Sequence, residues 1–115
     1  MKMYQYKATL LNVVDADTCD FDVDMGFNIR IKQRLRLFGI DAAELNSSDP
    51  IKKELTFKAK KFVNDTISVG KTYMIDTYKN DKYGRLLADI HLEDNPLTLN
   101  ALLLVNNLAT PYFGK

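Results

Sequence analysis

Two adjoining stretches between Cys19 and Leu37 alternate apolar and charged side chains at every second position. In the first stretch aspartates separate the apolar residues Cys19, Phe21, Val23 and Met25. After a turn at Gly26, arginine and lysine separate the apolar residues Ile29, Ile31, Leu35 and Leu37, and Gln33 is the only polar residue in the apolar phase. Successive side chains of a strand point to opposite faces, so this pattern predicts two antiparallel strands with one buried side.

The rest of the chain predicts an α+β fold that is mainly β. Strands are expected at Tyr4–Val14, before the alternating pair, and at Lys71–Thr77 and Leu86–Leu92 after it. Asp49 or Ser48 can cap a helix with Pro50 near its first position, whose apolar stripe is Ile51, Leu55, Ala59, Phe62 and Thr66. Thr98 can cap a short C-terminal helix that reaches Asn107. This order predicts the five-stranded barrel of an OB-fold, with a helix between strands three and four.

The length of 115 residues suits one domain, expected over residues 1–115. Sixteen Lys and Arg against fifteen Asp and Glu give a net charge of +1, which excludes a protein that coats nucleic acid by charge alone. The single Cys19 cannot form an internal disulfide, and there is no run of about 18 apolar residues that could span a membrane. Without an apolar signal region we expect a cytoplasmic protein, although a mature chain given a new Met1 would look the same.

Three groups of charged side chains stand where the predicted strands begin or end. They are Asp15 and Asp17 after the first strand, Asp41 and Glu44 after the third, and Arg36 and Arg85 on the strand faces that point away from the core. Hard cations such as Ca²⁺ bind carboxylates and carbonyls, and guanidinium groups match phosphate oxygens. Together the three groups predict a phosphodiesterase site. Taken alone, each is more often a solvated turn, a polar loop or a surface charge.

Five motifs occur in order along the chain. They are Ala8-Thr9-Leu10, Val14-Asp15-Ala16-Asp17-Thr18, Arg36-Leu37-Phe38-Gly39-Ile40-Asp41-Ala42-Ala43-Glu44, Asp81-Lys82-Tyr83-Gly84-Arg85, and a helix from Asn100 that ends in Asn107-Leu108-Ala109. Together they resemble the staphylococcal nuclease (thermonuclease) family, over residues 8 to 113. The resemblance implies an OB barrel with added helices and Ca²⁺-dependent hydrolysis of phosphodiester bonds in DNA and RNA.

The resemblance also implies which residues bind the metal and which act on the phosphate. Asp17 and Asp41 would bind Ca²⁺ together with the backbone carbonyl of Ala42, and Asp15 would lie behind them, near the metal. The catalytic residues would be Glu44, as general base or orienter of the attacking water, and Arg36 and Arg85, as contacts of the scissile phosphate. Lys82 and Tyr83 would contact a terminal phosphate of the nucleotide, and Tyr112 would either stack on a base or pack against the barrel.

One departure from the family keeps a second interpretation open. The family commonly has Pro before the catalytic glutamate, where this chain has Ala43. The alternative is a catalytically inactive OB-fold module that binds single-stranded nucleic acid or a protein partner, and a third possibility is an enzyme that works within a larger complex. A binding module has no need to keep all five of Asp17, Arg36, Asp41, Glu44 and Arg85, so the sequence favours a nuclease. We expect this nuclease to be a monomer that prefers single-stranded DNA or RNA and does not bind membranes.

Overall fold

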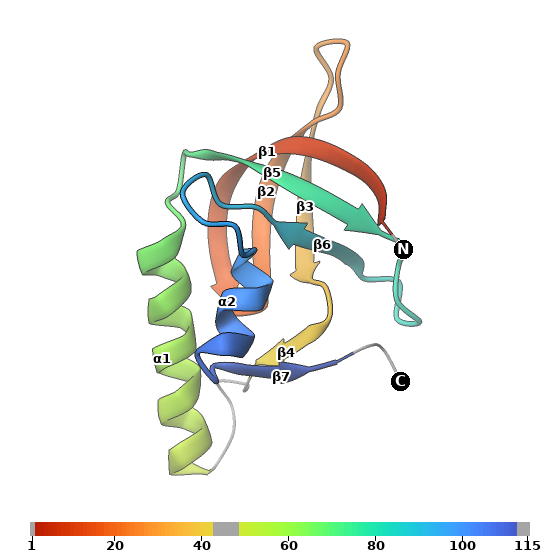
Figure 1. Ribbon diagram of the computed structural model, residues 1–115. Coiled ribbons are helices and arrows are strands. Elements are labelled where there is room, and N and C mark those ends of the chain that lie inside the picture. Colours follow the sequence, from red (N-terminus) through yellow and green to blue (C-terminus); the bar gives the residue numbers. More distant parts are fainter. Residues whose placement is uncertain (1, 43–48, 113–115) are drawn as a thin grey trace.

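The computed structural model describes residues 2–42 and 49–112, and five of its strands form a closed barrel. In chain order the elements are β1 (Lys2–Asp15), β2 (Thr18–Asp24), β3 (Arg30–Leu37), β4 (Ile40–Ala42), α1 (Pro50–Thr66), β5 (Thr72–Tyr78), β6 (Leu86–Ile90), α2 (Leu99–Val105) and β7 (Ala109–Pro111). The barrel order is β1-β2-β3-β6-β5, and both helices lie next to it (Figure 1). The predicted α+β fold, an OB barrel with a helix between its third and fourth strands, is therefore confirmed.

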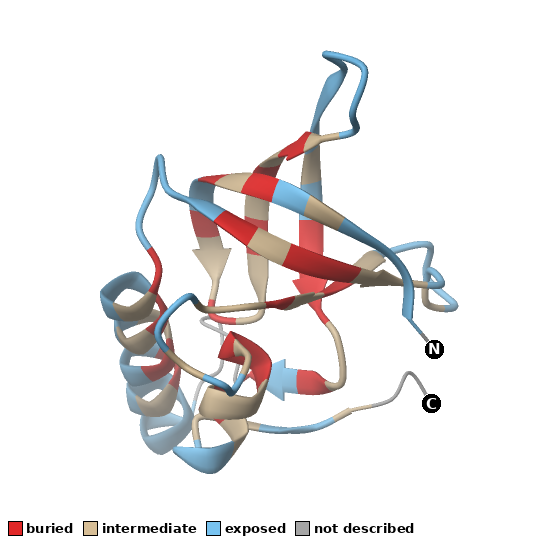
Figure 2. Ribbon diagram, turned by 45° about the horizontal axis from the view of Figure 1, so that its top comes forward, coloured by how far each residue is buried: buried red, intermediate tan, exposed pale blue. Residues whose placement is uncertain are grey.

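The length of β1 allows the barrel to close. Its residues pair with β5 from Lys2 to Thr9 and with β2 from Lys7 to Asp15, and shifts of register mark the points where the strand bends. On the other side β3 and β6 join through a short parallel pairing. The largest fully buried side chains include Leu10, Phe21, Leu37, Ile75 and Ile90. They form the apolar core, and Figure 2 shows buried and less buried residues alternating along the strands.

The alternation predicted for β2 and β3 holds inside the barrel and ends at the hairpin tip. Cys19, Phe21 and Val23 are buried, as predicted. On the outer face three salt bridges join the strands, Arg34–Asp20 at 2.8 Å, Arg30–Asp22 at 3.0 Å and Arg30–Asp24 at 4.0 Å. The apolar residues Met25, Ile29 and Ile31 are exposed instead of buried, because the tip of this hairpin projects beyond the barrel (Figures 1 and 2).

Helix α1 starts as predicted, and the predicted stripe holds in part: Ala59 is buried, and Phe62 packs against the core from a half-buried position. Asp49 is its N-cap and accepts a hydrogen bond from the backbone N–H of Ile51. The buried residues are Thr56, Ala59 and Val63, whereas Ile51 is exposed because the first turns of α1 extend past the barrel (Figure 1). Within the described residues, neither helix is long and apolar enough to cross a membrane.

A second, two-stranded sheet of β4 and β7 was not predicted. Its pairing sets Asp41 opposite Thr110 and Ala42 opposite Ala109. Each strand has only three residues, which is too short for a period of two to be recognised in the sequence. The pairing matters for the site because it places the residue after β7, Tyr112, where its N–H donates to the carbonyl of Gly39 at 2.9 Å.

Asn100, in the first turn of α2, is a buried polar residue that joins this helix to the barrel. Its side-chain amide donates to the carbonyls of Phe38, at 2.9 Å, and Ala88, at 3.0 Å. Its Oδ1 accepts from the N–H of Ile90 at 3.2 Å. All three backbone groups lie where β3 and β6 separate, and the carbonyl of Ala88 also accepts the N–H of Phe38 at 2.8 Å. The amide of Asn100 thus completes the hydrogen bonding of this buried region.

We expect replacement of Asn100 by Ala to lower the free energy of unfolding by about 3 kcal/mol, because buried backbone groups lose their partners. Chemical denaturation of both proteins measures this difference. Asn106→Ala is the matched control: this asparagine is exposed and donates to one carbonyl at the end of the same helix. We expect the control to lose less than about 1 kcal/mol. Equal losses for the two variants would contradict the structural role of Asn100.

Candidate active site

The guanidinium group of Arg36 lies at the centre of the candidate site. Its neighbours in β3, Leu35 and Leu37, point into the core, so Arg36 points outward; still, only 8 % of its side chain is exposed. Its Nη2 donates to Asp41 Oδ1 at 2.8 Å and lies 3.5 Å from Asp17 Oδ2. Its Nη1 donates to the carbonyl of Ile40 at 3.1 Å. The predicted phosphate contact is therefore in direct contact with both predicted metal ligands.

Asp17 fixes the position of β4 relative to the turn between β1 and β2. Its Oδ2 accepts the backbone N–H of Ala42 at 3.1 Å, and its Oδ1 accepts the hydroxyl of Thr18 at 3.1 Å. Its backbone carbonyl accepts the N–H of Leu37 at 2.8 Å. These bonds bring together two acidic segments that lie 24 positions apart in the sequence.

The carboxylates of this cluster suit a hard cation. Asp41 is 52 % exposed and Asp17 is largely buried, so the pair offers oxygen atoms at the edge of the site. Ala42 contributes its backbone to the same cluster through its bond to Asp17. Asp15 ends β1 and pairs with Thr18, the residue that bonds Asp17. Across residues 2–42 and 49–112, no three Asp, Glu, His or Cys side chains gather closely enough to hold a metal ion, and Glu44 lies outside the described residues.

Arg85 is held by a tight turn that begins at Asp81. One oxygen of Asp81 accepts the backbone N–H groups of Tyr83 and Arg85, each at 2.9 Å, and the other lies 2.6 Å from Arg85 Nε. Gly84 closes the turn with a φ of 76°, a conformation that glycine adopts without strain. Burial alone would raise the pKa of Asp81, but the hydrogen bonds from Arg85 and Tyr83 lower it below its usual range.

The position of Arg85 was predicted, but the role of Asp81 was not. The sequence signal for it is an aspartate three residues before a glycine, which is typical of a turn closed by the aspartate side chain. Because Asp81 uses the Nε of Arg85, the guanidinium keeps its terminal nitrogens for other partners. Burial by itself would lower the pKa of Arg85, whereas its hydrogen bonds with Asp81 and Tyr112 raise it.

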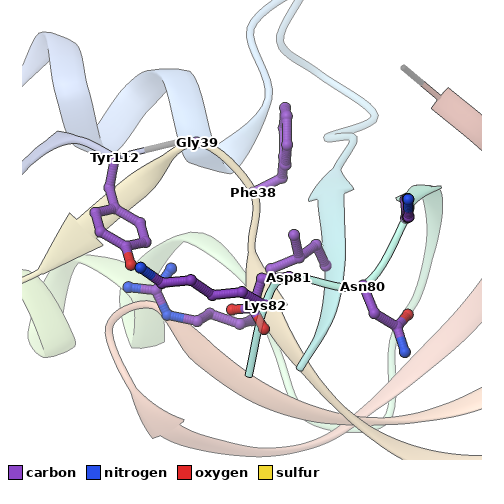
Figure 3. Close-up of a pocket in the computed structure, with 9 residues that line it drawn as sticks. Phe38, Gly39, Asn80, Asp81, Lys82 and Tyr112 are labelled. Atoms are coloured by element: carbon purple, nitrogen blue, oxygen red, sulfur yellow. The ribbon is translucent and has the colours of Figure 1, made fainter. Parts of the chain in front are cut away.

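Tyr112 and Arg36 line a pocket of about 350 Å³ together with Asp81 and Lys82 from the turn that precedes Arg85. The ring of Tyr112 lies 5.1 Å from the guanidinium carbon of Arg36, and its hydroxyl contributes to the raised pKa of Arg85. Figure 3 shows Tyr112 and Lys82 reaching into this pocket from different segments of the chain, with Phe38 and Asn80 at its other end. The apolar wall of the pocket is formed by Leu87 and by Phe38, which stacks on Tyr78.

Of the remaining predicted residues, Lys82 and Tyr83 lie at the edge of the site. Both are exposed, and Lys82 Nζ lies 5.2 Å from the centroid of the Tyr83 ring. The guanidinium carbon of Arg85 lies 5.1 Å from the same ring. The structure thus brings together Arg36, Asp17, Asp41, Arg85 and Tyr112, and places Lys82 and Tyr83 beside them.

We expect the Asp81 carboxyl to titrate below the usual value of about 3.9, and to move up toward it in Arg85→Ala. The lowered pKa means that the bonds of Asp81 stabilise the fold above that usual value and are lost as the pH falls through the lower, folded-state pKa. Titration of the Asp81 carboxyl by carbon NMR measures the shift, with Arg34→Ala as the control. An unchanged Asp81 titration in Arg85→Ala would contradict the assigned contact.

Comparisons with known proteins agree with this geometry. A model of the family described as staphylococcal nuclease homologue matches residues 34–115. A search of curated proteins found no match. The matched segment contains Arg36, Asp41, Arg85 and Tyr112, while Asp17 comes from the preceding hairpin of the same barrel. Since the match covers well over half of the chain, this protein belongs to the staphylococcal nuclease homologue family, a family of nucleases that act on nucleic acids.

Proposed function

We propose that this protein is a Ca²⁺-dependent nuclease that hydrolyses phosphodiester bonds of DNA, RNA or both at the Arg36 cluster. The observation that carries the proposal is the convergence of two carboxylates and two arginines on one end of the barrel. Carboxylates attract a cation, and guanidinium groups bind phosphate oxygens. Hydrolysis of a phosphate diester uses both a bound cation and positive side chains beside the phosphate, and this site has the groups for each.

Asp17 and Asp41 would hold the calcium ion, together with the backbone carbonyl of Ala42, and Asp15 would support them from behind. The contacts of Asp17 with Thr18 and Ala42 keep its carboxylate oriented before any ion binds. When bound, calcium would neutralise negative charge on a phosphate oxygen. The hard oxygen atoms of this cluster are the ligands that calcium prefers.

The two arginines would stabilise the additional charge of the transition state. Arg36 is fixed by three acceptors, so its position costs little reorganisation when a phosphate arrives. Arg85 is anchored to Asp81 through Nε, and its terminal nitrogens can donate to a phosphate oxygen. Glu44 would take a proton from the attacking water or orient it.

The pocket beside the arginines would bind the nucleotide next to the scissile bond. Lys79 and Lys82 line it and supply positive charge for a further phosphate, with Tyr83 beside them, and Phe38 and Leu87 form an apolar wall. Tyr112 would stack on a base, which requires that the base is unpaired. This requirement supports a preference for single-stranded substrates. All of these residues come from one copy of the chain, so the proposed enzyme acts as a monomer.

We expect Glu44→Gln and Arg85→Ala each to slow cleavage by about 10²-fold or more, as deletion of one transition-state contact does in other enzymes. Initial rates on labelled single-stranded DNA and RNA with Ca²⁺ measure the loss. Glu93→Gln and Arg30→Ala remove the same groups from exposed positions away from the site and should cleave like the wild type. Wild-type rates in both site variants would contradict the assignment.

We expect cleavage to require calcium and to stop when EDTA removes it, since Asp17 and Asp41 repel a phosphate unless a cation lies between them. The same labelled substrates incubated with Ca²⁺, Mg²⁺ or EDTA test this. Unchanged cleavage in EDTA would exclude the metal-dependent mechanism. Binding of nucleic acid without cleavage under every condition would instead identify an inactive binding module.

A further inference from the structure

The outward face of α1 carries an aromatic side chain that the fold does not use. Phe57 is 57 % exposed and lies off the face of the helix that the buried residues Thr56, Ala59 and Val63 form. Lys53 and Lys61 stand four positions before and after it, so the three residues form one line about 12 Å long on the helix surface. Together with Pro50, Glu54 and Lys58, they border a shallow surface pocket of about 440 Å³.

The charge of this face is positive. Helix α1 contains five lysines against Glu54 and Asp65. Both acids are paired within the helix, Glu54 with Lys58 at 3.4 Å and Asp65 with Lys61 at 3.1 Å, and all four side chains are exposed. Exposed pairs of this kind are weak, so a polyanion can displace the carboxylates. Lys53 forms no salt bridge with any residue that the structure describes.

An exposed aromatic ring with lysines on both sides has the chemistry of a single-strand contact. A base can stack on the ring while the flanking ammonium groups meet the phosphates on either side. The centre of a protein–protein interface is instead depleted in lysine, which argues against a protein partner here. Phe27 offers a contrast within the chain: it is 97 % exposed at the β2–β3 hairpin tip, where the nearby Arg30 is paired with Asp22.

We propose that Lys53, Phe57 and Lys61 form a second contact for single-stranded nucleic acid, separate from the pocket beside the arginines. Pro50 follows Ala42 by eight positions, so the start of α1 lies within roughly 29 Å of the candidate site. A strand of several nucleotides can cover such a distance. The inference rests on the proposed function for its ligand, but it concerns binding, which is measured without cleavage.

The test is the affinity of fluorescent oligothymidylates of 2 to 20 nucleotides, measured by anisotropy in EDTA so that no cleavage occurs. Wild-type affinity should increase with length as the strand reaches α1, and Phe57→Ala should bind the long oligomers roughly tenfold more weakly. Phe27→Ala is the matched control and should bind like the wild type. Because Phe57 is exposed, thermal unfolding should show that the variant keeps its fold.

A lysine variant tests the electrostatic part. Replacing Lys53, Lys58 and Lys61 by Gln should lower the slope of log affinity against log salt by about 2, whereas replacing Lys7, Lys32 and Lys71 should lower it less. Equal binding by Phe57→Ala and wild type would overturn the proposal. This holds even if the lysine variant binds weakly, because such a pair of results would show attraction by charge without stacking on Phe57. A wild-type protein that binds well but never cleaves would refute the proposed function and leave the α1 contact standing.

Discussion

The ion pairs of Arg36 connect the barrel to the candidate site. A guanidinium group with so little exposure requires acceptors, and it finds them on the β1–β2 turn and on β4, in Asp17, Asp41 and the carbonyl of Ile40. Asp17 also bonds to Ala42, so the contacts that hold β4 in place are the same ones that set the two carboxylates side by side. The geometry of the site is therefore a consequence of how this end of the barrel is closed. A substitution that moves β4 also moves the carboxylates of the site.

The barrel could be predicted because its strands repeat one pattern. Cys19, Phe21 and Val23 alternate with aspartates over enough positions for the period to be recognised. The same reasoning fails for β4 and β7, which are three residues each, and holds only in part for α1, whose apolar residues allow more than one buried face. Ile51 belongs to the stripe in sequence but lies beyond the barrel, and only tertiary structure determines where the barrel ends.

Polar pairs across strands are harder to predict, because they depend on register. Asp76 and Asp89 are directly opposite on β5 and β6, an unfavourable arrangement for like charges. Burial favours a raised pKa for both, and it does raise that of Asp89, whose carboxylate accepts the hydroxyl of Tyr78. For Asp76 the hydrogen bonds with His91 and Gln5 outweigh burial and lower the pKa. Nothing in the sequence around His91 indicates a carboxylate partner 15 positions away, so the sequence alone could not show how the two charges are accommodated.

Net charge is a poor guide to where a polyanion can bind this protein. Residues 28–61 hold nine Lys and Arg against four acids, yet Arg30 and Arg34 are paired with aspartates of β2, which makes the outer face of the hairpin nearly neutral. Basic side chains that form no salt bridge among the described residues include Lys79 and Lys82 beside the pocket and Lys53 on α1. Coulomb attraction between exposed charges is screened within about 10 Å at ordinary salt, so these local groups decide binding rather than the total of +1. The strand pairing thus lowers the attraction of the hairpin for a polyanion by neutralising Arg30 and Arg34.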